Sequence, residues 1–296
     1  MSSKAAKPKI RPETGDALRA SRGRDNTKWS LPNGERIAVW VVVNIEDFDL
    51  HYPIDGGESV PDYREYALRE YGNRAGMARI LAELDRYGIR GTGALNAAFA
   101  RNFPNWMAKC RDRGWDMMGH GDFNNRKMHG YSPEEEAVLI PSIMADIRIA
   151  WGQNPVGWLS PGLQQSEHTL SELVKVGVEY VADFCADDRP FDIPIQGSLL
   201  TSVPYSMDVN DKGAYGRAAL TPDGFRDLII SQFDELYMDG AQSPTVMVIA
   251  LHPYLTGLPY RIRALRGALE YIHAHPGIWW ATGAEIARQF RISSNR

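Results

Sequence analysis

A pair of adjacent carboxylates, Glu46 and Asp47, follows a long apolar segment near the start of the chain. The segment, residues 37–43, is apolar and mostly β-branched or aromatic, which is typical of a strand buried on both faces of a parallel sheet. Adjacent carboxylates can divide the work of a hydrolase, because one can take a proton from water while the other binds a cation or holds the substrate. The alternative is a solvated acidic turn at the end of an ordinary strand.

A histidine, His252, follows the second fully apolar run, residues 245–251. Its imidazole titrates near neutrality, so it can supply a proton to a leaving nitrogen. No serine or cysteine lies in a Gly-x-Ser-x-Gly type of nucleophile turn, and we interpret Cys185 as a small packing residue. These residue types indicate hydrolysis.

Polar residues also follow the other strand-like runs. They are Asn96, His120, the turn 158–162, Asp183, Asp187, Asp188, Asn210 and Asp211. In a barrel of parallel strands these ends share one rim, which is where barrel enzymes carry their catalytic groups. For Asp187 and Asp188 an exposed charged turn is the alternative.

Strand-like and helical segments alternate about seven times along the chain. Apolar residues at i, i+3, i+4 and i+7 predict a one-sided helix over 74–87, and Ser132, Pro133 and Glu135 form a capping signal for a helix that reaches about residue 150. Residues 49–73 are predicted to form a long loop. The alternation predicts an α/β fold, a single-domain (β/α) barrel over 36–296, preceded by a polar arm over 1–35 that is disordered at first. An open doubly wound sheet is the competitor, but no Gly-x-Gly-x-x-Gly follows a strand.

The composition restricts the partners of the protein. The 33 basic and 37 acidic residues give a net charge of −4 without a basic stripe, which argues against a nucleic-acid partner. No apolar run approaches the ~18 residues of a membrane-spanning helix, and no apolar stretch follows the basic N-terminus. We therefore expect a soluble cytoplasmic protein without a membrane partner, acting on a small molecule. The two cysteines, Cys110 and Cys185, make no disulfide framework.

The order of these landmarks resembles the polysaccharide-deacetylase superfamily, carbohydrate esterase family 4, over about residues 25–290. The segments that carry the resemblance are VNIEDF (43–48), GHGDFNN (119–125), GWLSPG (157–162), DFCADDRPF (183–191), VPYSMDVND (203–211) and LHPYLTGLPYRIRAL (251–265). Within the superfamily they are most similar to the branch of bacterial allantoinases and cyclic imide hydrolases. The resemblance implies a distorted (β/α)7 barrel, an oligomer (a dimer or tetramer) and hydrolysis of non-peptide C–N bonds.

The resemblance also implies roles for individual residues. It places Glu46 at the catalytic base, Asp47 at the metal-binding acid, His120 at the first metal histidine and His252 at the general acid. The second metal histidine of the family is replaced by Asn124, whose neutral amide is a poor zinc ligand beside imidazole. His129, or His51 with Asp49, are possible substitutes. The arginine that orients the base in deacetylases is absent from GWLSPG.

Both departures resemble the metal-independent allantoinases, so we expect no cofactor; zinc held by Asp47 and His120 is the alternative. Without a metal the carbonyl must be polarised by hydrogen-bond donors, such as backbone N–H groups or the amides of Asn44, Asn96 or Asn124. Asp47 or Asp188 would hold a substrate N–H. The residues predicted to bind substrate are Asn96, Asn124, Trp158, Asp187, Asp188, Tyr205 and Asn210, with Tyr254 as a further ring-stacking wall.

Three functions remain open from the sequence. The leading one is hydrolysis of a small cyclic amide, imide or ureide with Glu46 as base, Asp47 as substrate holder and His252 as acid. The second is a metal-dependent N-deacetylase of polysaccharides or chitooligosaccharides. The third is a barrel that binds a small ligand without catalysis.

Overall fold

The computed structural model describes residues 13–22, 28–57 and 60–294. The strands are β1 (Ile37–Ile45), β2 (Thr92–Leu95), β3 (Asp116–Gly119), β4 (Gly157–Trp158), β5 (Tyr180–Val181), β6 (Phe191–Ile195), β7 (Ser198–Ser202), β8 (Thr245–Leu251) and β9 (Ile278–Trp280). The helices are α1 (Glu13–Ser21), α2 (Tyr63–Tyr71), α3 (Met77–Asp85), α4 (Ala97–Asn102), α5 (Pro104–Arg111), α6 (Pro133–Trp151), α7 (Thr169–Lys175), α8 (Pro222–Asp239), α9 (Ile262–His273) and α10 (Gly283–Ser293).

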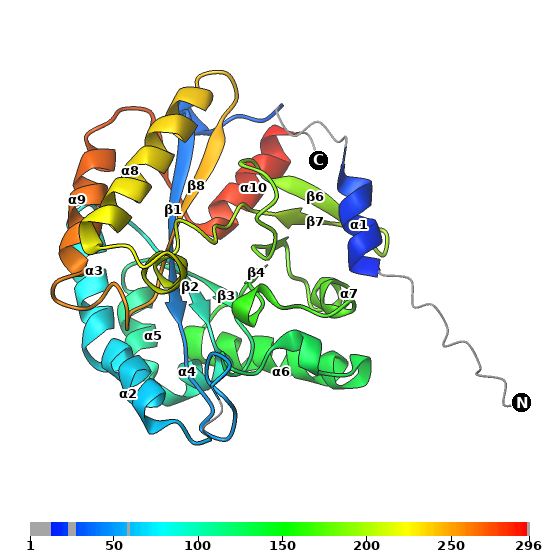
Figure 1. Ribbon diagram of the computed structural model, residues 1–296. Helices are drawn as coiled ribbons and strands as arrows, with labels where there is room; N and C mark the ends of the chain where they lie inside the picture. Colours follow the sequence, from blue (N-terminus) through cyan, green and yellow to red (C-terminus); the bar gives the residue numbers. More distant parts are fainter. Residues whose placement is uncertain (1–12, 23–27, 58–59, 295–296) are drawn as a thin grey trace, which may run out of the picture.

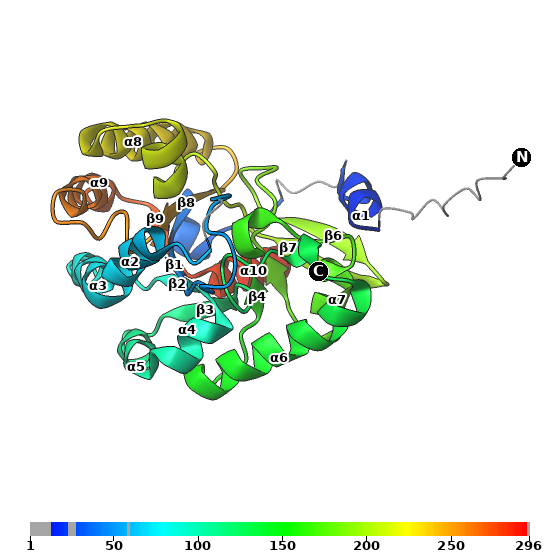
Figure 2. The same cartoon turned by 60° about the horizontal axis from the view of Figure 1, so that its bottom comes forward.

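The strands form one curled sheet in the order β6-β7-β5-β4-β3-β2-β1-β8, with β9 paired to β1 (Figure 1). All neighbours are parallel except β6 and β7, which form an antiparallel pair. Figure 2 shows α8, α9, α3, α4 and α6 around the outside of this sheet. The predicted distorted barrel of the deacetylase type is confirmed.

The central strand, β1, is buried along its whole length, which explains its continuous apolar sequence. Successive side chains point to opposite faces of a strand. Val39, Val41 and Val43 accordingly pack in the core between the sheet and the outer helices. Trp40 and Val42 pack in a second core inside the curl. α10 supplies apolar side chains to that inner core, among them Ile286 and Phe290.

β8 is the last strand at its end of the sheet order, and its free edge bonds to irregular segments instead of to a further strand. The N–H of Val246 donates to the carbonyl of Asp188 (2.9 Å), and that of Ala250 donates to the carbonyl of Val209 (3.0 Å). These bonds satisfy backbone groups at the edge of β8 that would otherwise lack partners. They also bring the segment around Asn210 beside the end of β8.

Two segments differ from the sequence prediction. The predicted loop 49–73 contains α2, whose N-cap Asp62 accepts from the N–H of Glu65 (3.0 Å). The hairpin strand β6 was not predicted, and its sequence FDIPI contains Pro194, which is tolerated because β6 is an edge strand.

The arm also contains the helix α1, which packs beside β6, while residues 1–12 of the arm lie outside the described part. None of the described helices combines the length and the apolar character that a membrane crossing requires.

Candidate active site

A cavity of about 670 Å³ opens at the carboxyl ends of the parallel strands. Its walls come from the segments that follow β1, β3, β4, β7 and β8, which are far apart in the sequence. Glu46, His120, Asn124, Tyr205, Asn210 and His252 all line it. The structure therefore brings these six predicted residues together.

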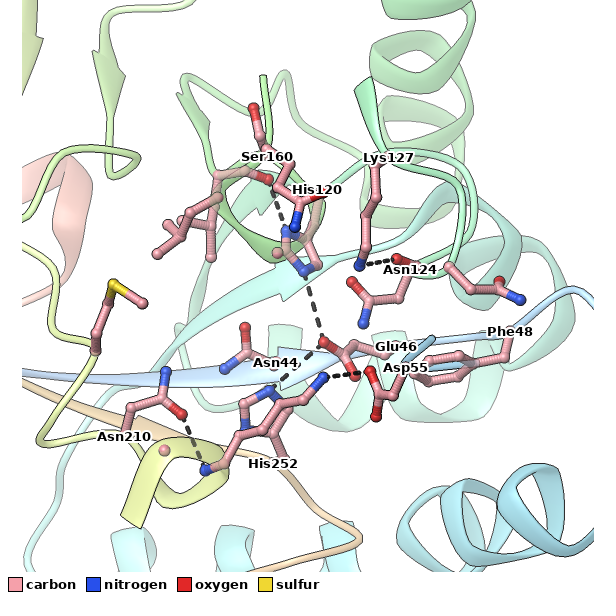
Figure 3. A pocket seen from close by; sticks show the side chains of 18 of the residues that line it. Asn44, Glu46, Phe48, Asp55, His120, Asn124, Lys127, Ser160, Asn210 and His252 are labelled. Carbon is pink, nitrogen blue, oxygen red and sulfur yellow. Dashed lines mark hydrogen bonds and ion pairs between the residues drawn. The ribbon is translucent and has the colours of Figure 1, made fainter. Parts of the chain in front are cut away.

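Glu46 lies between two histidines at the floor of the cavity (Figure 3). Its Oε1 is 3.6 Å from Nε2 of His120 and 3.6 Å from Nε2 of His252. Its Oε2 is buried and has no hydrogen-bond partner among the described residues. Burial alone would raise the pKa of Glu46, but the charge of His252 and the contacts with both imidazoles hold it well below its usual range. Glu46 is therefore an ionised carboxylate with one oxygen available to a ligand or a water.

His252 is held from behind by the fully buried Asp211. Its Nδ1 donates to Oδ1 of Asp211 (2.6 Å), and its backbone N–H donates to Oδ2 (2.8 Å). Thr256 donates to the same carboxylate through its hydroxyl (2.6 Å) and its backbone N–H (3.2 Å). Burial lowers the pKa of His252, but the charges of Asp211 and Glu46 outweigh burial and raise it to about 9. The imidazole is thus protonated at neutral pH and presents Nε2–H toward Glu46.

His120 is oriented by the turn that follows β4. Its Nδ1 donates to the carbonyl of Leu159 (2.6 Å), so Nε2 is the atom that faces Glu46. Buried Asp183 fixes this turn, because it accepts from the N–H (2.6 Å) and the hydroxyl (3.1 Å) of Ser160. Burial raises the pKa of Asp183 to about 7, against the opposing effect of these hydrogen bonds.

Trp158 is the last residue of β4, and its side chain points away from the cavity. It is fully buried in the core under the outer helices, and its Nε1 donates to the hydroxyl of Ser160 (2.9 Å). It does not line the cavity, so the structure does not support the prediction that it forms a ring-stacking wall.

Asp47 and Asn96 do not line the cavity, and their side chains form hydrogen bonds that connect the segments around its rim. Asp47 accepts from the N–H of Phe48 (2.8 Å) and from the amide of Asn102 (2.8 Å), and burial raises its pKa. Asn96 accepts from the N–H of Asp47 (3.0 Å) and donates to the carbonyl of His120. Both side chains are thus engaged in hydrogen bonds of the rim and lie outside the cavity wall.

Asn124 faces the cavity at the position of the family's second metal histidine. Its N–H donates to the carbonyl of Asp47 (2.9 Å), and its side-chain Oδ1 is buried with no partner among the described residues. An acceptor in this state suits an N–H of a ligand, because an unsatisfied buried acceptor is costly.

These side chains do not fit a zinc ion. Across residues 13–22, 28–57 and 60–294, no group of three or more His, Cys, Asp or Glu residues is arranged to hold a metal. The proposed substitutes do not repair this, since His51 is exposed and bonded to Asp49 (2.9 Å), and His129 is exposed. With Asp47 bonded to Asn102, only His120 of the family's metal ligands faces the cavity.

Asp187 and Asp188 lie in a separate hollow of about 500 Å³, together with Cys185. Tyr205 and Met207 line both this hollow and the main cavity, but neither Asp187 nor Asp188 lines the main cavity. The predicted substrate contact of Asp187 or Asp188 is therefore not supported. Tyr254 does not line the cavity either, and the Arg69 guanidinium lies over its ring at 4.7 Å.

Tyr205 and Asn210 both line the cavity and are joined by a hydrogen bond. The hydroxyl of Tyr205 accepts from the amides of Asn44 (3.3 Å) and Asn210 (3.4 Å). The amide of Asn44 also donates to the carbonyl of Leu251 (3.2 Å), so it ties the ends of β1 and β8 together.

Sequence reasoning missed four charged residues of the cavity: Asp55, Lys127, Lys212 and Arg217. Asp55 binds Nζ of Lys212 (2.7 Å) and pairs with Arg69. All four lie in segments between the predicted strands, where single charged residues carry no pattern. Only a motif with fixed spacing could have found them.

Comparison with known proteins identifies the class. No family model matches the chain. A Schizosaccharomyces pombe protein assigned as a polysaccharide deacetylase is 29% identical over 308 residues, covering 91% of this chain and 94% of that protein. The peptidoglycan deacetylase of Helicobacter pylori is 22% identical over 268 residues, covering 79% and 89%. The crystal structure of PuuE allantoinase has the same fold, with a TM-score of 0.81 and 24% identity over 88% of this chain and 92% of that one.

The sequence relatives and the shared fold together support the resemblance of the chain to the polysaccharide-deacetylase superfamily. These deacetylase and allantoinase relatives are hydrolases of carbon–nitrogen bonds other than peptide bonds.

Proposed function

We propose that the protein hydrolyses a small cyclic amide, imide or ureide without a metal ion. The observation that carries the proposal is the arrangement of Glu46 between His120 and His252, with Asp211 behind His252. A carboxylate with a free oxygen and a protonated imidazole face the same cavity, so a base and an acid are both in the protonation state that amide hydrolysis needs.

In the proposed reaction Glu46 takes a proton from a water, whose oxygen attacks the carbonyl carbon of the ring. His252 then delivers its Nε2 proton to the leaving nitrogen. Oδ1 of Asn124 accepts an N–H of the ring, since that oxygen is buried and otherwise unpaired. A cyclic imide or ureide offers adjacent N–H and C=O groups, which match this pairing of acceptors and donors.

The size of the cavity and the metal ligand set support this substrate class. A volume of about 670 Å³ lies in the range of small-molecule sites. The hydrogen bond from Asn102 to Asp47, and Asn124 in the place of a histidine, leave the family's zinc position without enough ligands. We propose that the reaction uses the protein's own side chains alone.

A hydrolysis screen tests the proposal. The panel contains allantoin, hydantoin and succinimide as cyclic substrates and N-acetylated chitooligosaccharides as deacetylase substrates, each with added zinc and with a chelator. We expect ring opening that survives chelation. Deacetylation that requires zinc would favour the metal-dependent alternative suggested by the names of the relatives, and a panel with no hydrolysis would favour a binding protein.

Replacing the base checks the mechanism. Glu46→Gln should lower kcat by about 10²–10⁴-fold, because the amide cannot take a proton from water. The exposed Glu134 on α6 provides the matched control, and Glu134→Gln should leave turnover unchanged. Circular dichroism shows that each variant is folded. Ring opening at the wild-type rate by Glu46→Gln would remove Glu46 from the mechanism.

A further inference from the structure

Besides the His252 imidazolium, three lysine and arginine side chains line the cavity, and they differ in how their charges are neutralised. Lys212 pairs with Asp55 (2.7 Å), and Arg217 pairs with Asp208 (2.8 Å). Lys127 also lines the cavity, but none of the described carboxylates lies within ion-pair distance of its Nζ. A half-buried ammonium without a carboxylate partner is costly unless a ligand supplies negative charge.

The position of Lys127 is fixed by its surroundings. Its Nζ donates to the carbonyl of Asn124 (2.6 Å), which leaves its other protons for the cavity. Gly162, in the turn after β4, has a φ of +64°, and a Cβ at this position would lie 3.1 Å from Nζ. The glycine thus leaves room for the ammonium. Figure 3 shows Lys127 entering the cavity on the side of His120 and Asn124, with Glu46 and His252 on the other side.

The charge of Glu46 reaches this ammonium. Burial lowers the pKa of Lys127, and Glu46 is the first of the groups that oppose this effect. A substrate carbonyl attacked by a water on Glu46 would therefore lie between a carboxylate and an ammonium.

Two of the three side-chain amides expected to polarise the carbonyl are used elsewhere. The Nδ2 group of Asn44 donates to Tyr205 and to the carbonyl of Leu251, and that of Asn96 donates to the carbonyl of His120. Lys127 is the cavity cation that keeps donors available and has no competing carboxylate among the described residues.

We infer that Lys127 is a catalytic residue whose ammonium binds the attacked carbonyl oxygen, first as the developing oxyanion and then as an oxygen of the product carboxylate. The inference rests on the proposed function, since it assigns the electrophilic group for that reaction. A positive charge at this oxygen does by electrostatics what a metal would otherwise do there.

The reaction balances with the groups at hand. The water oxygen bonds to the carbonyl carbon, its proton goes to Glu46, and the carbonyl electron pair moves onto the oxygen beside Lys127. When this pair re-forms the carbonyl, the C–N bond breaks and the nitrogen takes the proton of His252. The proton on Glu46 restores His252, and the new carboxylic acid loses its proton to solvent.

The first test uses turnover of the cyclic substrate found in the screen. Lys127→Met should lower kcat by about 10²–10³-fold with little change in KM, because the interaction is made mainly in the transition state. Lys127→Arg should recover part of this loss because it keeps the positive charge. Lys175→Met, a surface lysine on α7 paired with Glu172, is the matched control and should retain the wild-type rate. A folded Lys127→Met enzyme with wild-type kcat would overturn the inference and leave the proposed function standing.

The second test does not depend on turnover. Succinamate and N-carbamoylglycine, the ring-opened products of succinimide and hydantoin, are titrated calorimetrically into the wild-type protein and both lysine variants. Binding should weaken at least about tenfold in Lys127→Met and remain unchanged in Lys175→Met. Absent or equally strong binding in wild type and Lys127→Met would overturn the inference. Lys127-dependent binding without hydrolysis in the screen would instead retain the anion site and reject the proposed function.

A third measurement covers variants that fail to fold. Acylation of lysines in the wild-type protein is followed by mass spectrometry with and without succinamate. The bound carboxylate should protect Lys127 several-fold and leave Lys175 unprotected. Equal acylation of Lys127 in both conditions would count against its contact with the carboxylate.

Discussion

The contact between Asp211 and His252 allows a prediction of how the enzyme responds to pH. Asp211 is fully buried and accepts four hydrogen bonds, two from His252 and two from Thr256. The variant Asp211→Asn removes the negative charge while keeping the shape of the side chain. It also places an amide N–H₂ where one carboxylate oxygen now accepts, so at least one buried donor loses its acceptor.

The size of the effect follows from the pKa of His252. The ordinary value is 6.5 and the environment raises it to about 9, a difference that corresponds to about 3 kcal/mol in favour of the imidazolium. Asp211 is the largest of the favourable contributions, followed by Glu46, and burial opposes both. Loss of the Asp211 charge should lower the pKa of His252 by at least about one unit.

The direction of the pH dependence follows from linkage. Since folding raises the pKa of His252, the stability that its charge contributes is fully present below about pH 6.5 and is lost as the pH rises through about 9. In wild type the free energy of unfolding should therefore fall between these values, and the fall should be smaller in Asp211→Asn. Because His252 is the proposed general acid, the alkaline limb of kcat should move to lower pH in the variant.

NMR titration of the His252 ring and urea unfolding at several pH values provide the measurements. Asp223→Asn is the control, since Asp223 is an exposed residue at the start of α8. It should leave the titration midpoint of His252 unchanged. A wild-type His252 that titrates near 6.5, or a midpoint that does not fall in Asp211→Asn, would refute the reasoning.

Two further predictions concern the rim of the cavity. Gly76→Ala should destabilise the protein by about 1–3 kcal/mol and lower kcat, because the added Cβ would lie 2.0 Å from the carbonyl oxygen of Pro253, next to His252. Thermal and urea unfolding measure the loss of stability. Gly130→Ala is the control, since a Cβ there meets nothing within 4 Å. Asn124→His should not create a tight zinc site, since Asp47 remains bonded to Asn102. One zinc per chain in that variant, measured by metal analysis after dialysis, would show that Asp47 turns toward the cavity more readily than this bonding implies.

The fold was predictable where burial is extreme, and less so where packing is irregular. β1 and β8 are buried at every residue and sit side by side, so their sequences carry the sheet signal without interruption. α2 was missed because its start depends on Asp62 as a cap within a segment rich in Gly and Pro. β6 was missed because proline and the edge position weaken the strand pattern.

The alternation of side chains along β1 decides which of the two adjacent carboxylates, Glu46 or Asp47, faces the cavity. Trp40 and Val42 point into the curl, so the period of two continues through Asn44 to Glu46. Val43 and Ile45 point toward the outer helices, and Asp47 continues that series to meet Asn102 of α4. Two adjacent strand-end carboxylates therefore cannot both face the cavity while the strand geometry holds.

The same period explains the other strands that supply the cavity. Met118 of β3 and Ala250 of β8 pack in the inner core, and His120 and His252 follow them two residues later. Trp158 of β4 packs in the outer core, so it is excluded from the cavity. Asn96 follows inward-facing Ala94 yet bonds to the backbone of the rim, because the chain turns into α4 at this point. Strand phase thus selects which polar side chains can reach the cavity, and the start of the next helix decides which of them do.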